Sequence, residues 1–196
     1  MSSTQPQAPS PRATGRRFGA VSAVATAVVA LAGPHATVGM ALASDGAIAI
    51  AQGVSVTPAP GWTLGNRGPN WVALNNADTS AQMRITVKHA DGTDAAAVLQ
   101  ADIDQYVSGA SAILTGVNRL TAPDVTPLQG PNFQQQASLN YTAGVVNPQG
   151  TIPVIGTFTE LLNTSNGRSA FIDFRQDSSA TTQAAGDGGM MVGSME

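Results

Sequence analysis

Alternation of apolar and polar residues marks the clearest strand in the chain. Between residues 82 and 88, Met, Ile and Val alternate with Arg, Thr and Lys, a pattern that predicts a strand with one buried and one solvated face. Apolar runs at residues 54–56 and 71–74 predict two more strands. Residues 61–70 lie between those runs, are rich in Gly, Pro and Asn, and are expected to form a loop.

The spacing of apolar residues changes after the Asp-Gly pair that ends the strand at 82–88, and it predicts a helix over residues 95–107. Thr93 or Asp94 is expected to cap this helix by accepting a hydrogen bond from a free backbone N–H. Asp102 and Asp104 are expected on its solvated side. The apolar positions that should pack on a sheet are Val98, Leu99, Ile103, Tyr106 and Val107.

The second half of the chain predicts an antiparallel meander. Residues 134–145, 152–162 and 169–175 alternate apolar and polar positions, and a polar turn at 163–167 joins the last two as a hairpin. Residues 119–128 contain two prolines, which restrict that segment to an edge strand or a loop. Strands, one capped helix and a meander together predict an α+β fold in which helices cover an antiparallel sheet.

The end of the chain is expected to add a short second helix. Residues 178–196 are small and interrupted by glycines, which weakens helix formation. Met190, Met191 and Met195 supply apolar side chains that can dock such a helix on the sheet. Trp62, which follows a Pro-Gly turn, is expected to reach the core.

The N-terminal 43 residues differ from the rest of the chain. Residues 1–17 are polar, rich in Pro and Ser, and carry three arginines, so we expect a disordered basic tail or the n-region of a signal peptide. Residues 18–43 are uncharged and support two hypotheses, a retained transmembrane anchor or a signal peptide that is removed by cleavage near Ala43. A buried helix of a soluble protein is a third. Residues 44–53 are interpreted as a linker and 54–196 as the folded domain.

Both main hypotheses place the folded domain outside the cytoplasm. In the first, the chain is a single-pass cell-membrane protein whose arginines hold the N-terminus in the cytoplasm and whose C-terminal domain is extracytoplasmic. In the second, the domain is secreted. In the first hypothesis, the cell membrane is itself a partner, which residues 18–43 contact.

The order of these elements resembles a known domain type. The Pro60-Gly61-Trp62 turn, the strands at 71–74 and 83–88, the covering helix, the meander and the methionine-containing end at 190–195 resemble the Mog1/PsbP-type domains. Among these, the chain is similar to small exported or membrane-tethered proteins of actinobacteria such as the LpqN-like group. The resemblance implies an α/β/α sandwich that is a non-catalytic binding or assembly module.

Composition removes most catalytic chemistry. The chain has no cysteine, which excludes disulfides, thiolate metal sites and a lipid-modified cysteine. His89 is the one histidine of residues 44–196, and no G-x-S-x-G motif accompanies it. Asp91, Asp94, Asp102 and Asp104 do not have the spacing of a calcium loop. We therefore predict no enzyme, no metal and no cofactor.

Charge and aromatic residues give the remaining functional expectations. Residues 44–196 contain six basic and twelve acidic residues, which disfavours nucleic acid as a partner. Glu160 is interpreted as part of the solvated face of its strand. Trp62 and Trp71 are nine residues apart and are the candidate ligand-binding pair. The predicted function is a cell-envelope accessory module that binds a partner protein in envelope assembly or transport, with a lipid or glycolipid carrier as the alternative.

Overall fold

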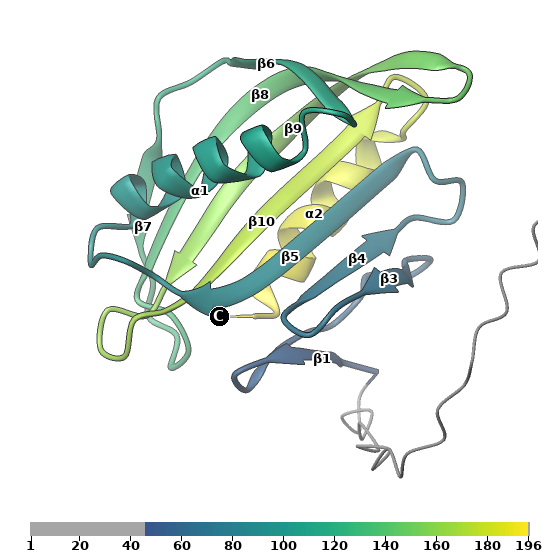
Figure 1. Cartoon of the computed structure of the whole chain (residues 1–196). Helices are drawn as coiled ribbons and strands as arrows, with labels where there is room; N and C mark the ends of the chain where they lie inside the picture. The colour runs from purple at the N-terminus through teal and green to yellow at the C-terminus, as the bar shows by residue number, and fades with distance from the viewer. Residues whose placement is uncertain (1–45, 196) are drawn as a thin grey trace, which may run out of the picture. The chain divides into compact units, whose positions relative to one another are not determined.

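The computed structural model describes residues 46–195, which form an antiparallel sheet with one helix on each face (Figure 1). This confirms the predicted α+β fold. The strands are β1 (Ile48–Ala51), β2 (Val54–Val56), β3 (Thr63–Arg67), β4 (Trp71–Asn75), β5 (Ala81–His89), β6 (Leu114–Arg119), β7 (Asp124–Pro127), β8 (Gln135–Asn147), β9 (Gly150–Leu162) and β10 (Arg168–Asp177), and the helices are α1 (Ala95–Gly109) and α2 (Thr182–Gly193).

The predictions for residues 1–17 and 18–43 lie outside the described part of the chain. Within residues 46–195, neither helix is long and apolar enough to cross a membrane.

The main sheet runs in the order β3-β4-β5-β10-β9-β8-β6, and β7 also pairs with β8. All its neighbours are antiparallel. The last hairpin joins β9 to β10, as the polar turn at 163–167 predicts. The proline-containing segment forms the short edge strand β7, which agrees with the expectation of an edge strand.

Two predicted elements have the expected internal structure. In β5, buried and half-buried residues alternate from Ala81 to Lys88, so the period-two pattern identified both its faces. Helix α1 begins after Asp94, whose side chain accepts a hydrogen bond from the backbone N–H of Ala96 at 3.0 Å. Of the two candidate caps, Asp94 is therefore the one used.

Two predictions about the start of the domain were wrong. The expected linker at 44–53 contains β1, which pairs with β2 and buries Ile50 in the core. Gln52 and Gly53 make the tight turn between these strands with positive φ values of 50° and 79°. The expected loop at 61–70 contains β3, an exposed edge strand that has no apolar alternation and was therefore missed.

The two faces of the sheet form two separate cores. The α2 face is apolar and is closed by the β1-β2 ribbon, with Trp62, Met83, Ile85, Ile172, Met191 and Met195 among its buried residues. The α1 face packs Leu99, Ile103, Leu139, Tyr141, Phe158 and Phe171 beneath the helix. Met190 differs from the two docking methionines because it is 55% exposed.

Candidate functional site

A groove lies on the α1 face because the sheet is wider than its covering helix. Helix α1 packs on β8 and β9, and Figure 1 shows it crossing that side of the sheet. Neither helix of residues 46–195 covers the same face of β4 and β5. A pocket of about 390 Å³ opens there, between the C-terminal part of α1 and strands β3, β4 and β5.

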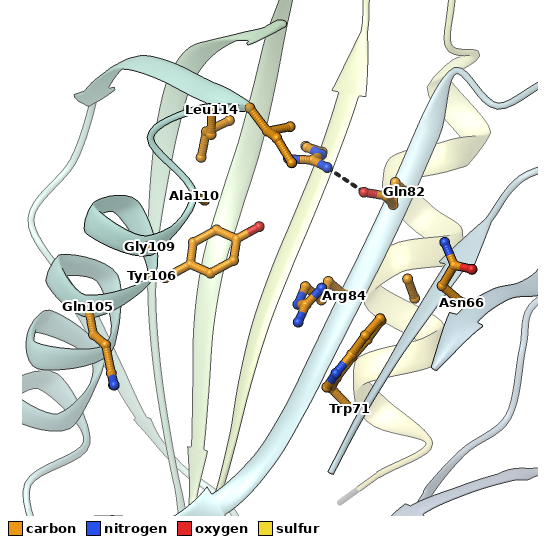
Figure 2. Close-up of a pocket in the computed structure, with 12 residues that line it drawn as sticks. Asn66, Trp71, Gln82, Arg84, Gln105, Tyr106, Gly109, Ala110 and Leu114 are labelled. Atoms are coloured by element: carbon orange, nitrogen blue, oxygen red, sulfur yellow. Dashed lines mark hydrogen bonds between the residues drawn. The ribbon is translucent and has the colours of Figure 1, made fainter. Parts of the chain in front are cut away.

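Trp71 and Arg84 form one wall of this groove (Figure 2). Val72 and Leu74 point into the α2-side core, so strand alternation places Trp71 on the α1 face. The guanidinium of Arg84 lies over the Trp71 ring, 3.9 Å from its centroid. A contact of this kind orients an arginine and leaves the N–H groups in its plane available.

The floor of the groove contains a second arginine. Arg175 on β10 donates a hydrogen bond to the side-chain oxygen of Gln82 (Figure 2) and lies 3.7 Å from a carboxylate oxygen of Asp173. Asp173 is buried and accepts hydrogen bonds from the hydroxyls of Tyr106 at 2.8 Å and Tyr141 at 2.5 Å. This buried carboxylate therefore has its partners inside the protein.

The two tyrosines are held in their neutral, donating form. Burial is the main cause that raises the pKa of Tyr106 and of Tyr141 above the ordinary value, and the charge of Asp173 adds to it. Because both hydroxyls keep their protons, they act as fixed hydrogen-bond donors to Asp173. Tyr106 also lines the groove, so this network fixes one of its walls.

The placement of Glu160 contradicts the sequence-based interpretation. Its side chain is 0% exposed, and it lies on the α1 face of β9 together with Phe158 and Leu162. Asp102, expected on the solvated side of α1, is also buried and pairs with Lys88 of β5. Helix α1 covers this strip of the sheet, so the face that would be wet in an open sheet is dry.

Glu160 is best described as a protonated acid. Burial, followed by the charge of Asp102, raises the pKa of Glu160 well above its ordinary value, while Ser169 and Lys88 oppose that shift. Both carboxyl oxygens of Glu160 and one of Asp102 are buried without another hydrogen-bond partner. A proton on Glu160 that bridges to Asp102 satisfies one oxygen of each carboxyl. Glu160 therefore holds a proton between β9 and α1.

The two predicted ligand-binding tryptophans do not form a pair. Trp62 lies in the α2-side core, where its indole N–H donates to Asp187 of α2 at 2.9 Å and its ring packs against Phe174. Trp71 lines the groove on the opposite face. Of the two, Trp71 is the residue placed where a ligand can reach it.

The other candidate residues have structural surroundings. The His89 ring contacts the carbonyl oxygen of Ala90 at the end of β5. Asp94 caps α1, and Asp104 accepts hydrogen bonds from Arg119 and Gln100. Across residues 46–195, no cluster of three or more His, Asp or Glu side chains is arranged to hold a metal ion.

Arg84 and Arg175 are groove residues that the sequence patterns did not single out, and Tyr106, expected to pack on the sheet, also lines the groove. The sequence does indicate the position of Arg84. It lies between Met83 and Ile85, which are buried, so strand alternation directs it away from the α2-side core. The register between β5 and β10, which brings Arg175 opposite Gln82, requires the structure.

No family model matches the chain, and no curated protein resembles it in sequence. Among solved structures, a mutant form of the protein Mog1 matches with a TM-score of 0.50 at 10% identity, over 76% of this chain and 91% of that one. The Saccharomyces cerevisiae Ran-binding protein Mog1p gives a TM-score of 0.49 at 10% identity, over 72% and 86%.

The first of these likenesses supports the predicted fold family. Residues 46–195 have a Mog1-like fold, an antiparallel sheet between two helices. At this identity, the likeness concerns the fold alone.

Proposed function

We propose that this domain is a non-catalytic module that binds a partner protein in the groove beside α1. The observation that carries the proposal is the pairing of half-buried Trp71 with Arg84 in a concave site of about 390 Å³. Aromatic and arginine side chains in such a position supply most of the binding energy at many protein interfaces. Ile113, 53% exposed at the groove, adds an apolar contact.

A binding role also fits the acid and base groups of the domain. Glu160 and Asp173 are buried beneath α1 and are engaged with neighbouring side chains. General acid or base catalysis requires a titratable group within hydrogen-bonding reach of a substrate. The polar side chains that line the groove are instead those of arginine, tryptophan, tyrosine and the amides. Such side chains donate or accept hydrogen bonds but are not general acids or bases near neutral pH.

We propose further that the module works in the cell envelope. The support is the uncharged stretch at residues 18–43, preceded by Arg16 and Arg17. With such an anchor or signal, the domain meets its partner outside the cytoplasm. We therefore propose a role in envelope assembly or transport.

Site-specific photo-crosslinking in the cell of origin tests the binding surface. Benzoylphenylalanine is introduced into the full-length chain at Ile113, or at Met190 as the matched control. Both side chains are exposed to nearly the same degree, 53% and 55%, but Ile113 lies at the groove and Met190 on α2. We expect a discrete protein adduct from position 113 and none of that size from 190.

Two results would contradict the proposal. The same adducts from both positions would mean that the groove has no special role. Transfer of label from position 113 to extractable lipid, with no protein adduct, would favour the alternative, a lipid or glycolipid carrier.

A further inference from the structure

Arg84 differs from the other arginines of residues 46–195. Each of the others has a hydrogen bond or an ion pair with another part of the domain, through Ala49 for Arg67, Asp104 for Arg119, Gln52 for Arg168 and Gln82 for Arg175. Arg84 instead makes a cation–π contact with the Trp71 ring. Within the described residues, its guanidinium has neither a carboxylate partner nor a hydrogen-bond acceptor.

The charges of the groove lining favour an anion as its ligand. Arg84 and Arg175 bring two positive charges to it, one of which is offset by Asp173, the ion-pair partner of Arg175. The other polar side chains that line it, Asn66, Gln82, Gln105 and Tyr106, are neutral. The acid closest to this set, Asp173, is buried and already accepts two tyrosine hydroxyls. An anion entering the groove therefore meets unused N–H donors and no exposed carboxylate of the lining.

The shape of the groove favours an anion carried by a polypeptide. Trp71 and exposed Ile113 place apolar surface beside the two arginines. A small free oxyanion gains nothing from such surface, whereas a peptide with an apolar residue next to its carboxylate buries both. The planar donor edge of a guanidinium also matches the two oxygens of a carboxylate.

We infer that the groove recognises an acidic segment of its partner, with a Glu or Asp carboxylate bound at Arg84 and a neighbouring apolar side chain against Trp71 and Ile113. The inference rests on the proposed function, because it names the chemistry of the partner at the same site. Arg175 supplies the second positive charge from the groove floor, where Gln82 and Asp173 hold it in place.

The two tryptophans provide an internal reference for the test. The full-length chain, labelled with ¹⁵N and held in detergent micelles, is titrated with the blocked peptide acetyl-Gly-Leu-Glu-Leu-Gly-amide while the indole and arginine side-chain N–H signals are recorded. We expect saturable shifts at Trp71 and Arg84 and no shift at Trp62, which is buried on the opposite face. The Trp62 signal also reports that each variant is folded.

Three controls identify the recognised chemistry. The peptide with Gln in place of Glu is expected to bind at least about tenfold more weakly, and so is the Glu peptide to the variant Arg84→Gln. Arg67→Gln, on the edge strand β3 outside the pocket lining, should leave binding unchanged. Added salt should weaken binding of the Glu peptide because the contact is ionic.

Each remaining outcome overturns the inference in a distinct way. Equal binding of the Glu and Gln peptides would show that the groove does not recognise the charge of the peptide. Inorganic phosphate that shifts Trp71 and Arg84 as strongly as the peptide would indicate a general anion site. No shift at Trp71 with any probe, or an adduct from position 113 that persists undiminished in Arg84→Gln, would refute acidic recognition while leaving protein binding at the groove in place.

Discussion

The two tryptophans of this chain show how differently the two faces of one sheet are used. Trp62 is enclosed by the α2-side core and has its N–H satisfied by Asp187. Trp71 is half-buried at the edge of α1 and supports an arginine. The α2 face is mostly apolar, whereas the α1 face carries Asp102, Glu160 and Asp173 in its interior. Apolar burial stabilises both faces, but only the α1 face also has the groove in which Trp71 and Arg84 lie.

Replacing each tryptophan by alanine should give the largest contrast. Trp62→Ala leaves a cavity in the core and removes one of the two hydrogen bonds that Asp187 accepts, while the one from Gln183 remains. We expect a loss of about 3–5 kcal/mol in the free energy of unfolding. Trp71→Ala removes a half-buried ring and should cost about 1 kcal/mol or less. Denaturant unfolding of both variants measures the difference. Equal losses would mean that the groove wall is part of the core.

The buried carboxylate beneath α1 gives the next effect in size. Tyr141→Phe removes the hydroxyl that donates to Asp173 and leaves that oxygen without its partner in a dry site. We expect a loss of about 2 kcal/mol in the free energy of unfolding. Tyr106→Phe, which removes the other donor at a less buried position, should cost about 1 kcal/mol. Losses near zero for both would show that water replaces the hydroxyls.

The contrast between the faces also explains what the sequence could predict. Strand β5 was identified because its buried and solvated positions differ in kind, and α1 because it has a cap and helical spacing. The interpretation of Glu160 as solvated was wrong because it relied on the charge of the side chain and not on strand alternation. Glu160 lies two residues from Phe158 and from Leu162, which are both buried, so alternation alone puts it on the covered face.

The groove could be predicted only in part. Parity places Trp71 on the face opposite Val72, and hence opposite the core that contains Trp62, but the expected loop at 61–70 concealed this. The position of α1 over β8 and β9 determines which part of the face stays open, and this depends on contacts between residues distant in sequence. Local patterns carry no information about such packing.

The proton that buried Glu160 retains should make stability depend on pH. Folding raises the pKa of Glu160, so above its ordinary value of 4.5 the folded state binds more protons than the unfolded state. Stability is therefore lost as the pH rises from that value toward the raised one. Glu160→Gln cannot ionise and can still donate to Asp102, and we expect it to stabilise the domain by about 1 kcal/mol at pH 8.

Unfolding curves at pH 4.5 and pH 8 measure this effect. The gain from Glu160→Gln should be smaller at the lower pH, where the wild-type carboxyl is protonated in the folded state and about half protonated in the unfolded state. Asp124→Asn, at an exposed carboxylate on β7, is the control and should stay within about 0.5 kcal/mol at both values. If Glu160→Gln instead lowers the free energy of unfolding, and does so more at pH 8 than at pH 4.5, Glu160 is ionised in the folded protein.

Arg84→Gln should have the smallest effect on stability. The guanidinium is outside both cores and has its contact with the Trp71 ring, so its loss should change the free energy of unfolding by no more than about 0.5–1 kcal/mol. Arg175→Gln offers the comparison, because it removes a charge held near buried Asp173 and should cost more. A residue that contributes little to folding, yet brings to a groove a cation with no hydrogen-bond acceptor among residues 46–195, is placed for binding. If Arg84→Gln instead unfolds the domain as readily as Trp62→Ala, the groove belongs to the structural core and the distinction between the two faces fails.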